Sequence, residues 1–231
     1  MSRKEDFIIE GEKLVKYLGD DENVVIPGGI KRIGEGAFIN SDVVSIVIPD
    51  GVEFIDWDAF IGSKSIEKVT FPESLIYVDG DAFAFCNKLS LITTATMDHI
   101  SDCEDALYFI GFPNSKIVVK VESDELPRFF AFSAKTKGDN LSDFVRKGKW
   151  GEYDSELIYN GPKYRYTNEQ RILGAISRLM NPVELTEENK QLYINFLKKR
   201  TKNKILDVAK FVGCIELVNE VEKILAISEE S

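Results

Sequence analysis

The sequence has few of the residues that most often carry enzyme chemistry. Among 231 residues there is one histidine, His99, and there are three cysteines, Cys86, Cys103 and Cys214. No serine or cysteine motif stands beside His99, so a nucleophile, a base and an orienting acid cannot be assembled. His99 and Cys103 are four residues apart and could share a helical face, but a lone histidine near a cysteine is more often incidental. We predict buried, reduced thiols and no catalytic residue.

Long apolar runs and phosphate-binding loops are also missing. No stretch of about 18 apolar residues is available to span a membrane. The N-terminal MSRKEDFIIEGEKL has acidic residues where a secretory signal needs apolar ones. Neither a GxGxxG nor a GK[ST] motif is present, and we expect no cofactor and no metal. These absences predict a cytoplasmic protein.

The whole chain has a formal net charge of −10, and positive charge is scarce in its first half. Residues 1–122 have 11 Lys and Arg against 22 Asp and Glu, a net charge of −11, whereas residues 123–231 have 18 against 17, a net charge of +1. A surface as acidic as the first half repels nucleic acid and anionic membranes, and it favours a basic protein partner.

The first half does contain a segment that recurs three times between residues 24 and 91. Each copy has an Ile-Pro or Phe-Pro step, and Pro27, Pro49 and Pro72 lie 22 and 23 residues apart. An Ala-Phe pair follows each proline after ten residues; the pairs are Ala37-Phe38, Ala59-Phe60 and Ala82-Phe83. Self-similarity at this period predicts a solenoid.

Each copy also predicts the parts of one turn. An apolar step that ends at proline is typical of a short strand, because proline has no N–H to continue the ladder. We expect the alanine to let neighbouring turns approach and the phenylalanine ring to fill the middle of the coil. Three residues after each ring comes a small side chain, Ser41, Ser63 or Cys86, which suits hydrogen bonding to loop backbone inside the stack.

The pattern IP-xx-V-xx-I-xxx-AF-xx-C/S-xx-L resembles the BspA-type leucine-rich repeat over residues 24–91. The resemblance implies a leucine-rich-repeat β-solenoid that binds other proteins. Upstream, Phe7–Ile9 and Leu14–Tyr17 are similar to the strand pair that opens such arrays. Downstream, residues 92–121 depart from the pattern, and we interpret them as a degenerate last turn that ends in a strand at Ile117–Val121. The predicted solenoid therefore covers residues 5–122.

After residue 122 the apolar period changes to 3.6, which predicts an α-helical domain over residues 123–228. Thr167 and Gln170 form a capping box, and Thr186 begins another helix. A last helix pair hinged at Gly213 resembles an ankyrin helix pair. The predicted fold class is α+β, a leucine-rich-repeat β-solenoid followed by an α-helical domain that caps its open end.

Two further features of the second half each have a structural and a functional interpretation. The basic run Lys198–Lys204 suits a phosphate-rich ligand, but a solvated helix end explains it more simply. The aromatic residues between Trp150 and Tyr166 suit a partner interface, but packing between the two halves is the simpler prediction.

The candidate partner-binding residues of the first half form two short columns, since Asp56 and Asp79, like Asp58 and Asp81, occupy equivalent places in neighbouring repeats. Successive turns lie roughly 4.8 Å apart, so the carboxylates of each pair would face each other at a cost in stability. Either they point into water, or a cation or a basic partner neutralises them, with Trp57 as an aromatic anchor.

We predict a non-catalytic protein–protein interaction scaffold that presents this acidic repeat surface to a basic protein. Nucleic acid and membranes are not expected partners, and self-association through an uncovered solenoid edge stays open. The alternatives are an enzyme or effector whose activity lies in the C-terminal helical domain, or a surface adhesin if the protein is exported.

Overall fold

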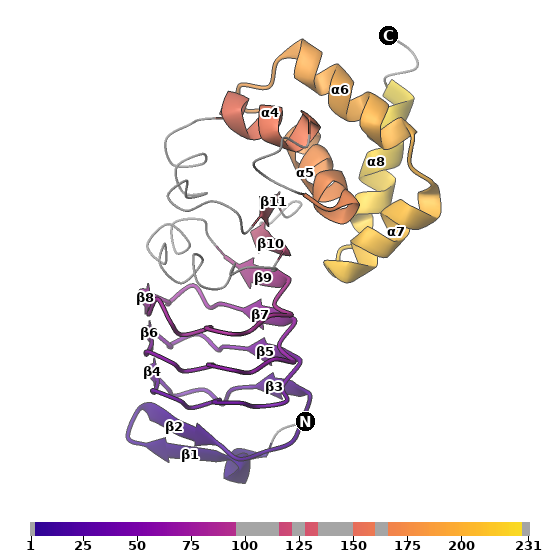
Figure 1. The fold of residues 1–231 in the computed structure, drawn as a ribbon. Helices are drawn as coiled ribbons and strands as arrows, with labels where there is room; N and C mark the ends of the chain where they lie inside the picture. The colour runs from indigo at the N-terminus through magenta and orange to yellow at the C-terminus, as the bar shows by residue number, and fades with distance from the viewer. Residues whose placement is uncertain (1–2, 96–115, 122–127, 134–149, 160–165, 228–231) are drawn as a thin grey trace.

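The structure is a computed structural model of the whole chain. It describes residues 3–95, 116–121, 128–133, 150–159 and 166–227. Figure 1 shows a stack of short strands that begins at the N-terminus and a group of helices at the opposite end. The alternative in which His99 and Cys103 share a helical face concerns residues outside the described ones.

The strands of the stack form two sheets. The first has the order β1-β2-β4-β6-β8 and the second the order β11-β10-β9-β7-β5-β3. The elements of the first sheet and the short 3-10 helix before it are η1 Lys4–Asp6, β1 Phe7–Glu10, β2 Lys13–Tyr17, β4 Arg32–Ile33, β6 Phe54–Ile55 and β8 Tyr77–Val78. The strands of the second sheet are β3 Asn23–Val25, β5 Ser45–Val47, β7 Lys68–Thr70, β9 Leu91–Thr94, β10 Lys116–Val121 and β11 Arg128–Ser133.

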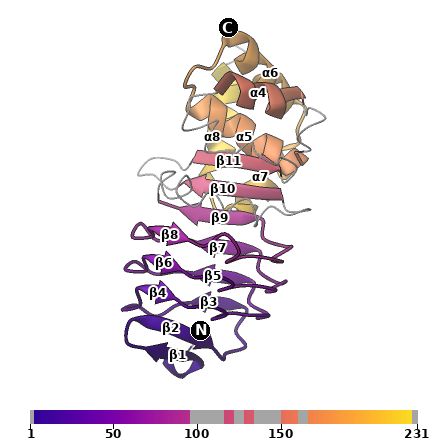
Figure 2. The same cartoon turned by 60° about the vertical axis from the view of Figure 1, so that its left-hand side comes forward.

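The predicted repeats are the turns of this stack. Val24 on β3 pairs with Ile46 on β5, and Ile46 pairs with Val69 on β7, so equivalent residues of successive copies lie side by side in parallel strands. Figure 2 shows the turns one above the other. The predicted leucine-rich-repeat β-solenoid is confirmed, with about four turns in the N-terminal part.

A column of aromatic rings fills the middle of the solenoid. Phe38, Phe60 and Phe83 stack with centroid distances of 5.0 and 4.6 Å, and all three are buried. Stacked rings at these distances stabilise each other beyond their apolar burial, by about 0.5–1.5 kcal/mol a pair. The alanine before each ring is completely buried, as expected for a residue that lets neighbouring turns approach.

The predicted column of small side chains is also confirmed. Ser63 Oγ donates to the carbonyl oxygen of Phe38 at 2.5 Å, and Cys86 Sγ donates to that of Phe60 at 3.2 Å. Ser63 Oγ also accepts from the backbone N–H of Ser41 at 3.2 Å. These bonds satisfy buried backbone groups of one turn with a side chain of the next.

The antiparallel pair β1 and β2 closes the first turn, as predicted from its resemblance to an opening strand pair. Its Tyr17 ring stacks on Phe38 at 5.1 Å, and Phe7 lies 5.1 Å from Tyr17. The hairpin therefore extends the aromatic column by two rings and covers its N-terminal end.

The C-terminal end of the solenoid is covered by one more strand than expected. The predicted strand at Ile117–Val121 is β10, which runs parallel to β9, and β11 pairs with β10 in antiparallel register. Strand β11 lies beyond residue 122, where the sequence predicted helices. Its FFAF stretch is a short apolar run in the sequence, and such a run alone does not distinguish a strand from a helix.

Five helices follow in the described residues, and two of them begin at the predicted caps. Their bounds are α4 Trp150–Tyr159, α5 Asn168–Met180, α6 Glu187–Lys198, α7 Lys202–Phe211 and α8 Glu216–Ile227. Thr167 accepts from the Gln170 N–H at 3.0 Å, and Thr186 accepts from the Asn189 N–H at 3.2 Å. In the described part of the chain, no helix combines the length and the apolar run that a bilayer crossing needs.

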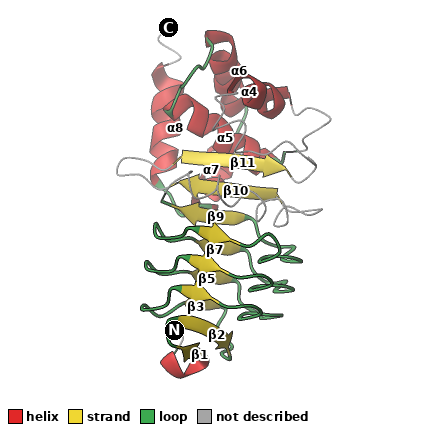
Figure 3. Ribbon diagram, turned by 90° about the vertical axis from the view of Figure 1, so that its left-hand side faces the viewer, coloured by secondary structure: helices red, strands yellow, loops and turns green. Residues whose placement is uncertain are grey.

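Helix α5 joins the helical half to the last strand. It packs along β11, and Ser177 Oγ accepts from the Phe129 N–H at 3.1 Å. Leu91 of β9 and Val118 of β10 belong to the same hydrophobic cluster as Ile172 of α5. Figure 3 shows the helices lying directly beyond β11.

The aromatic segment between Trp150 and Tyr166 begins with helix α4, which spans Trp150–Tyr159. The predicted packing role holds for two of its members, because Trp150 packs against the solenoid core and Tyr153 is buried in the helical core. Turn-forming residues surround this segment in sequence, and they masked its helical period.

Candidate partner-binding site

The five predicted partner-binding residues lie at one corner of the solenoid. Asp56, Trp57 and Asp58 follow β6, and Asp79 and Asp81 follow β8. Because β6 and β8 are parallel and in register, these two segments lie one turn apart. The structure thus brings the two predicted columns together.

The first of these acids, Asp56, is neutralised by the chain itself. Arg32 Nη1 lies 2.5 Å from Asp56 Oδ1, and Lys13 Nζ lies 3.3 Å from Oδ2. These cations come from β4 and β2, the two strands that precede β6 in the sheet. The expectation of an uncompensated charge at Asp56 is therefore wrong, because the earlier turns carry basic residues at the positions that face it.

Trp57 is held at the surface by the next turn. Its Nε1–H donates to Asp81 Oδ2 at 3.2 Å, and 52% of the residue is exposed. An exposed tryptophan that is already oriented loses little side-chain freedom when a partner covers it. The bond therefore fixes the orientation of this ring at the surface.

A second exposed aromatic residue lies on the same corner and was not predicted. Tyr77 is 47% exposed, and its hydroxyl donates to Asp79 Oδ2 at 3.3 Å. Tyr77 pairs in register with Phe54, whose ring lies 4.5 Å from Arg32 Cζ. Alternation along β6 and β8 could have indicated that Phe54 and Tyr77 face outward, because the next residues, Ile55 and Val78, face the core.

Within the described residues, Asp58, Asp79 and Asp81 form no ion pair, but Asp79 and Asp81 accept hydrogen bonds from Tyr77 and Trp57. For Asp58, loss of hydration raises the pKa of its carboxyl, and the charges of Asp81, Glu35 and Asp79 raise this pKa further. Its φ of +56° is in the left-handed region, where Gly36 stands in the preceding repeat with φ +61°. Asp58 is thus a half-exposed negative charge under repulsion, which a cationic group from outside would relieve.

Two further kinds of site, a metal site and a reactive thiol, would depend on His, Cys, Asp and Glu side chains. Within the described ranges, no group of three or more His, Cys, Asp or Glu side chains is placed to hold a metal ion. Cys86 and Cys214 are buried free thiols, as predicted. Burial raises the pKa of the Cys86 thiol to about 12, so it stays protonated at neutral pH.

The helical half contains a buried charged network that the sequence did not indicate. Arg178 Nε and Nη2 donate to the two carboxylate oxygens of Asp154 at 2.7 and 2.9 Å, and Tyr193 donates to Asp154 Oδ1 at 2.7 Å. Asp154 and Arg178 are 0% and 3% exposed. Burial, followed by the charge of Asp154, raises the pKa of Tyr193, which keeps its hydroxyl a donor.

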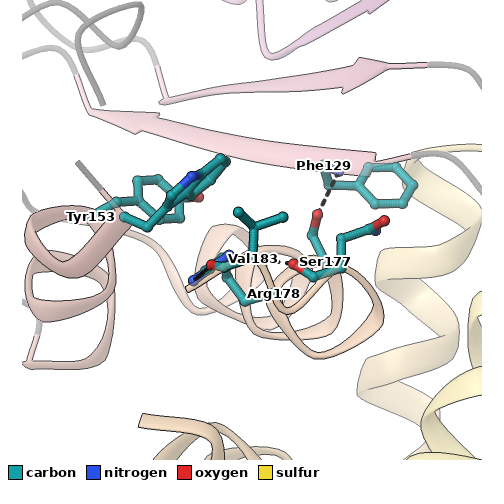
Figure 4. A pocket seen from close by; sticks show the side chains of 7 residues that line it. Phe129, Tyr153, Ser177, Arg178 and Val183 are labelled. Atoms are coloured by element: carbon teal, nitrogen blue, oxygen red, sulfur yellow. Dashed lines mark hydrogen bonds between the residues drawn. The ribbon is translucent and has the colours of Figure 1, made fainter. Parts of the chain in front are cut away.

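A small cavity lies beside this network. Figure 4 shows Arg178 between Tyr153 and Ser177, with Val183 and Phe129 on the same cavity wall. Its volume of about 30 Å³ is enough for a water molecule but not for a substrate. Arg178 also donates to the Val183 carbonyl at 2.9 Å, so its role here is to join helices α4 and α5 to the loop after α5.

The two-sheeted solenoid with one repeat per turn is the architecture of a leucine-rich-repeat β-solenoid. In agreement, residues 15–111 match the family model described as BspA type leucine rich repeat region (6 copies). The predicted BspA-type repeats are thereby confirmed over a longer segment than residues 24–91. Such repeats typically mediate protein–protein interaction or surface binding. The likeness of the last two helices to an ankyrin helix pair stays a prediction.

Solved structures that resemble this chain are leucine-rich repeat proteins. A leucine rich repeat protein of T. pallidum is 22% identical with a TM-score of 0.38, and the match covers 45% of this chain and 57% of that one. A leucine rich cell surface protein of Faecalibacterium prausnitzii A2-165 is 24% identical with a TM-score of 0.33, covering 42% and 33%. This chain thus spans less than two thirds of the length of either. No curated protein sequence matches it.

Proposed function

We propose that this protein is a non-catalytic interaction scaffold that binds a basic protein at the corner formed by Asp56, Trp57, Asp58, Asp79 and Asp81. The observation that carries the proposal is the exposed Trp57 ring, which Asp81 holds in place beside the unneutralised Asp58. Tryptophan is enriched among residues that dominate binding energy, and these residues are usually surrounded by weaker polar contacts.

The charges of the corner have different tasks in this proposal. Asp56 is occupied by Arg32 and Lys13, so it stabilises the corner. Asp58 offers its carboxylate to a lysine or arginine of the partner. The excess of acids over residues 1–122 attracts such a partner from a distance and makes its association rate depend on salt.

Affinity capture with matched variants tests the proposal. Wild-type protein, the Asp58→Asn/Asp81→Asn variant and a Glu187→Gln/Glu188→Gln control are immobilised at equal density, and proteins bound from a native lysate are identified. The control removes the same two charges from exposed positions at the start of α6. We expect a basic protein that the wild type and the control retain, that higher salt weakens and that the double variant loses. Equal retention by all three proteins would refute the assignment of the corner.

We further propose that residues 123–228 serve the solenoid as a cap, with β11 and α5 covering its last turn. In this proposal the chain divides by function after residue 122, into a binding part and a capping part. The sheet itself continues past this point into β11. The covered apolar side chains of β9 and β10 support it. The alternative is that the helical half has an activity of its own. In that case the Asp58→Asn/Asp81→Asn variant would leave this activity unchanged.

We place the interaction in the cytoplasm and away from nucleic acid and membranes. Fractionation of intact cells with surface labelling tests this location. Labelled full-length protein at the cell surface would favour the adhesin alternative instead. Size-exclusion chromatography coupled to light scattering then decides whether the protein also binds a second copy of itself.

A further inference from the structure

A second surface feature lies in the helical half and is independent of the acidic corner. It is a hollow of about 430 Å³ between the end of α4, the start of α5 and the second half of α6. Leu157, Tyr159, Leu192 and Phe196 give it apolar walls, and Arg171 and Arg200 give it charge. Its volume falls in the range of about 300–1,000 Å³ that small-molecule sites occupy.

The structure divides the basic run Lys198–Lys204 into paired and unpaired members. Lys202 pairs with Glu222, and Lys204 pairs with Glu169, both at 2.5 Å. Lys199 and Arg200 instead line the hollow. A solvated helix end therefore explains only part of the run.

Two guanidinium groups meet at one ring in this hollow. The Cζ atoms of Arg171 and Arg200 lie 4.5 and 4.1 Å from the centroid of the Phe196 ring. The ring faces attract each cation, but the two like charges repel each other. In the described part of the chain, neither arginine has a carboxylate partner within ion-pair distance.

The hydrogen bonds of the two arginines differ. Arg171 donates from Nε to the Leu157 carbonyl at 3.0 Å and from Nη2 to the Ile158 carbonyl at 2.5 Å, so the end of α4 fixes it. Arg200 Nε is buried and has no hydrogen-bond partner among the described residues. A buried donor without an acceptor is costly, and a charged donor more so.

The charges of the two arginines also lack compensation. Burial, and after it the charge of Arg200, lowers the pKa of Arg171. A negative ligand at this place would supply the missing counter-charge for the pair and would accept hydrogen bonds from the accessible N–H groups of Arg200.

We propose that this hollow binds a small organic oxyanion, whose carboxylate or phosphate group meets Arg200 and Lys199 and whose apolar body lies against Leu192 and Tyr159. Arg171 contributes charge and holds Phe196 in position. Carboxylate and phosphate groups each present a pair of oxygens that a guanidinium fork can bind through two parallel hydrogen bonds, and the choice between them is part of the test.

The probes are phenyl phosphate and benzoate, with benzyl alcohol as a neutral compound of similar shape. Each is titrated into the full-length protein by calorimetry, and the Nε–H signal of Arg200 is followed by NMR. We expect at least one anion to bind with a Kd in or below the millimolar range and to shift that signal, whereas benzyl alcohol does neither. The stronger anion identifies the headgroup.

Matched variants locate the site. Arg200→Gln should weaken the binding of the preferred anion about tenfold, whereas Lys198→Gln, on an exposed residue outside the hollow, should leave it unchanged. Arg200→Lys keeps the charge without the Nε donor, so its affinity for the anion should lie between those of the other two variants. This variant keeps the test valid if Arg200→Gln folds poorly. No binding of either anion at about 10 mM, or equal binding of benzyl alcohol, would overturn the proposal.

Discussion

In the described residues, the ion pairs of the solenoid lie at the surface, whereas the helical half contains a buried ion pair. Asp56 and Arg32 are 21% and 43% exposed in their side chains, and Asp154 and Arg178 are 1% and 3% exposed. Exposed pairs contribute up to about 1 kcal/mol, so the solenoid depends for its stability on its stacked core. The helical half depends in addition on a polar network that must stay complete. The two halves should therefore respond differently to mutation.

The largest effect should come from separating the halves. A chain of residues 1–133 ends at β11 and lacks α5, whose side chains cover β11 and the outer residues of β9 and β10. Its exposed apolar end should make it aggregate, because an uncovered sheet associates with other copies. Size-exclusion chromatography and thermal unfolding would show this. A soluble, cooperatively folding fragment would contradict the capping proposal.

The next largest effect should come from the buried pair. Arg178→Met leaves the carboxylate of Asp154 buried without its cation, which typically costs about 3–5 kcal/mol in free energy of unfolding. Lys190→Met breaks the exposed pair with Glu187 and should cost less than about 1 kcal/mol. Urea denaturation measures both. Equal costs would mean that the buried network does not support the helical half.

The aromatic column provides the matching test for the solenoid. Phe60→Leu removes the stacked contacts with Phe38 and Phe83 and should cost about 2 kcal/mol. Phe85→Leu changes an exposed ring in the same repeat region and should stay within about 0.5 kcal/mol. If the two variants unfolded at the same urea concentration, the column would not be the main source of stability there.

The two halves also differ in how far the sequence predicts them. In the solenoid, one repeat specifies all turns, so Pro27, Ala37 and Phe38 and their equivalents indicated strands, core and spacing at once. In the helical half each helix is different. The caps at Thr167 and Thr186 were evident, because a cap depends on residues close in sequence.

Contacts between distant segments were not evident from the sequence. Asp154 and Arg178 lie on different helices, and nothing in their local sequence identifies them as partners. The same holds for Asp56, whose cations Lys13 and Arg32 come from earlier turns. Of the candidate corner, the sequence identified the acids and Trp57. It did not indicate Tyr77, because the side of this ring is set by the alternation along β8, a strand of only two residues.

The smallest effect should come from Asp58, the repelled acid of the corner. Its pKa is raised in the folded protein, so the folded chain binds this proton more readily than the unfolded chain. The ionised carboxyl therefore weakens folding at neutral pH, and the penalty disappears as the pH falls through the raised pKa to the unfolded value of about 3.9.

Asp58→Asn should accordingly stabilise the protein at pH 7 by less than about 1 kcal/mol, because water screens this half-exposed group. The gain should vanish at about pH 3, where both side chains are neutral. Asp42→Asn, the same change at an exposed position, is the control. Urea titrations at the two pH values check the result, and a gain that persists at low pH would point to backbone strain at φ +56° instead.

Site-specific photocrosslinking tests the central claim most directly, since it reports which surface meets a partner inside cells that produce the protein. Tyr77 on the acidic corner and Ile215, an exposed residue in the helical half, are each replaced by p-benzoylphenylalanine. We predict a crosslink to one basic protein from position 77 and none to that protein from position 215. Crosslinks to the same protein from position 215 alone would contradict the assignment of the binding surface to the solenoid corner.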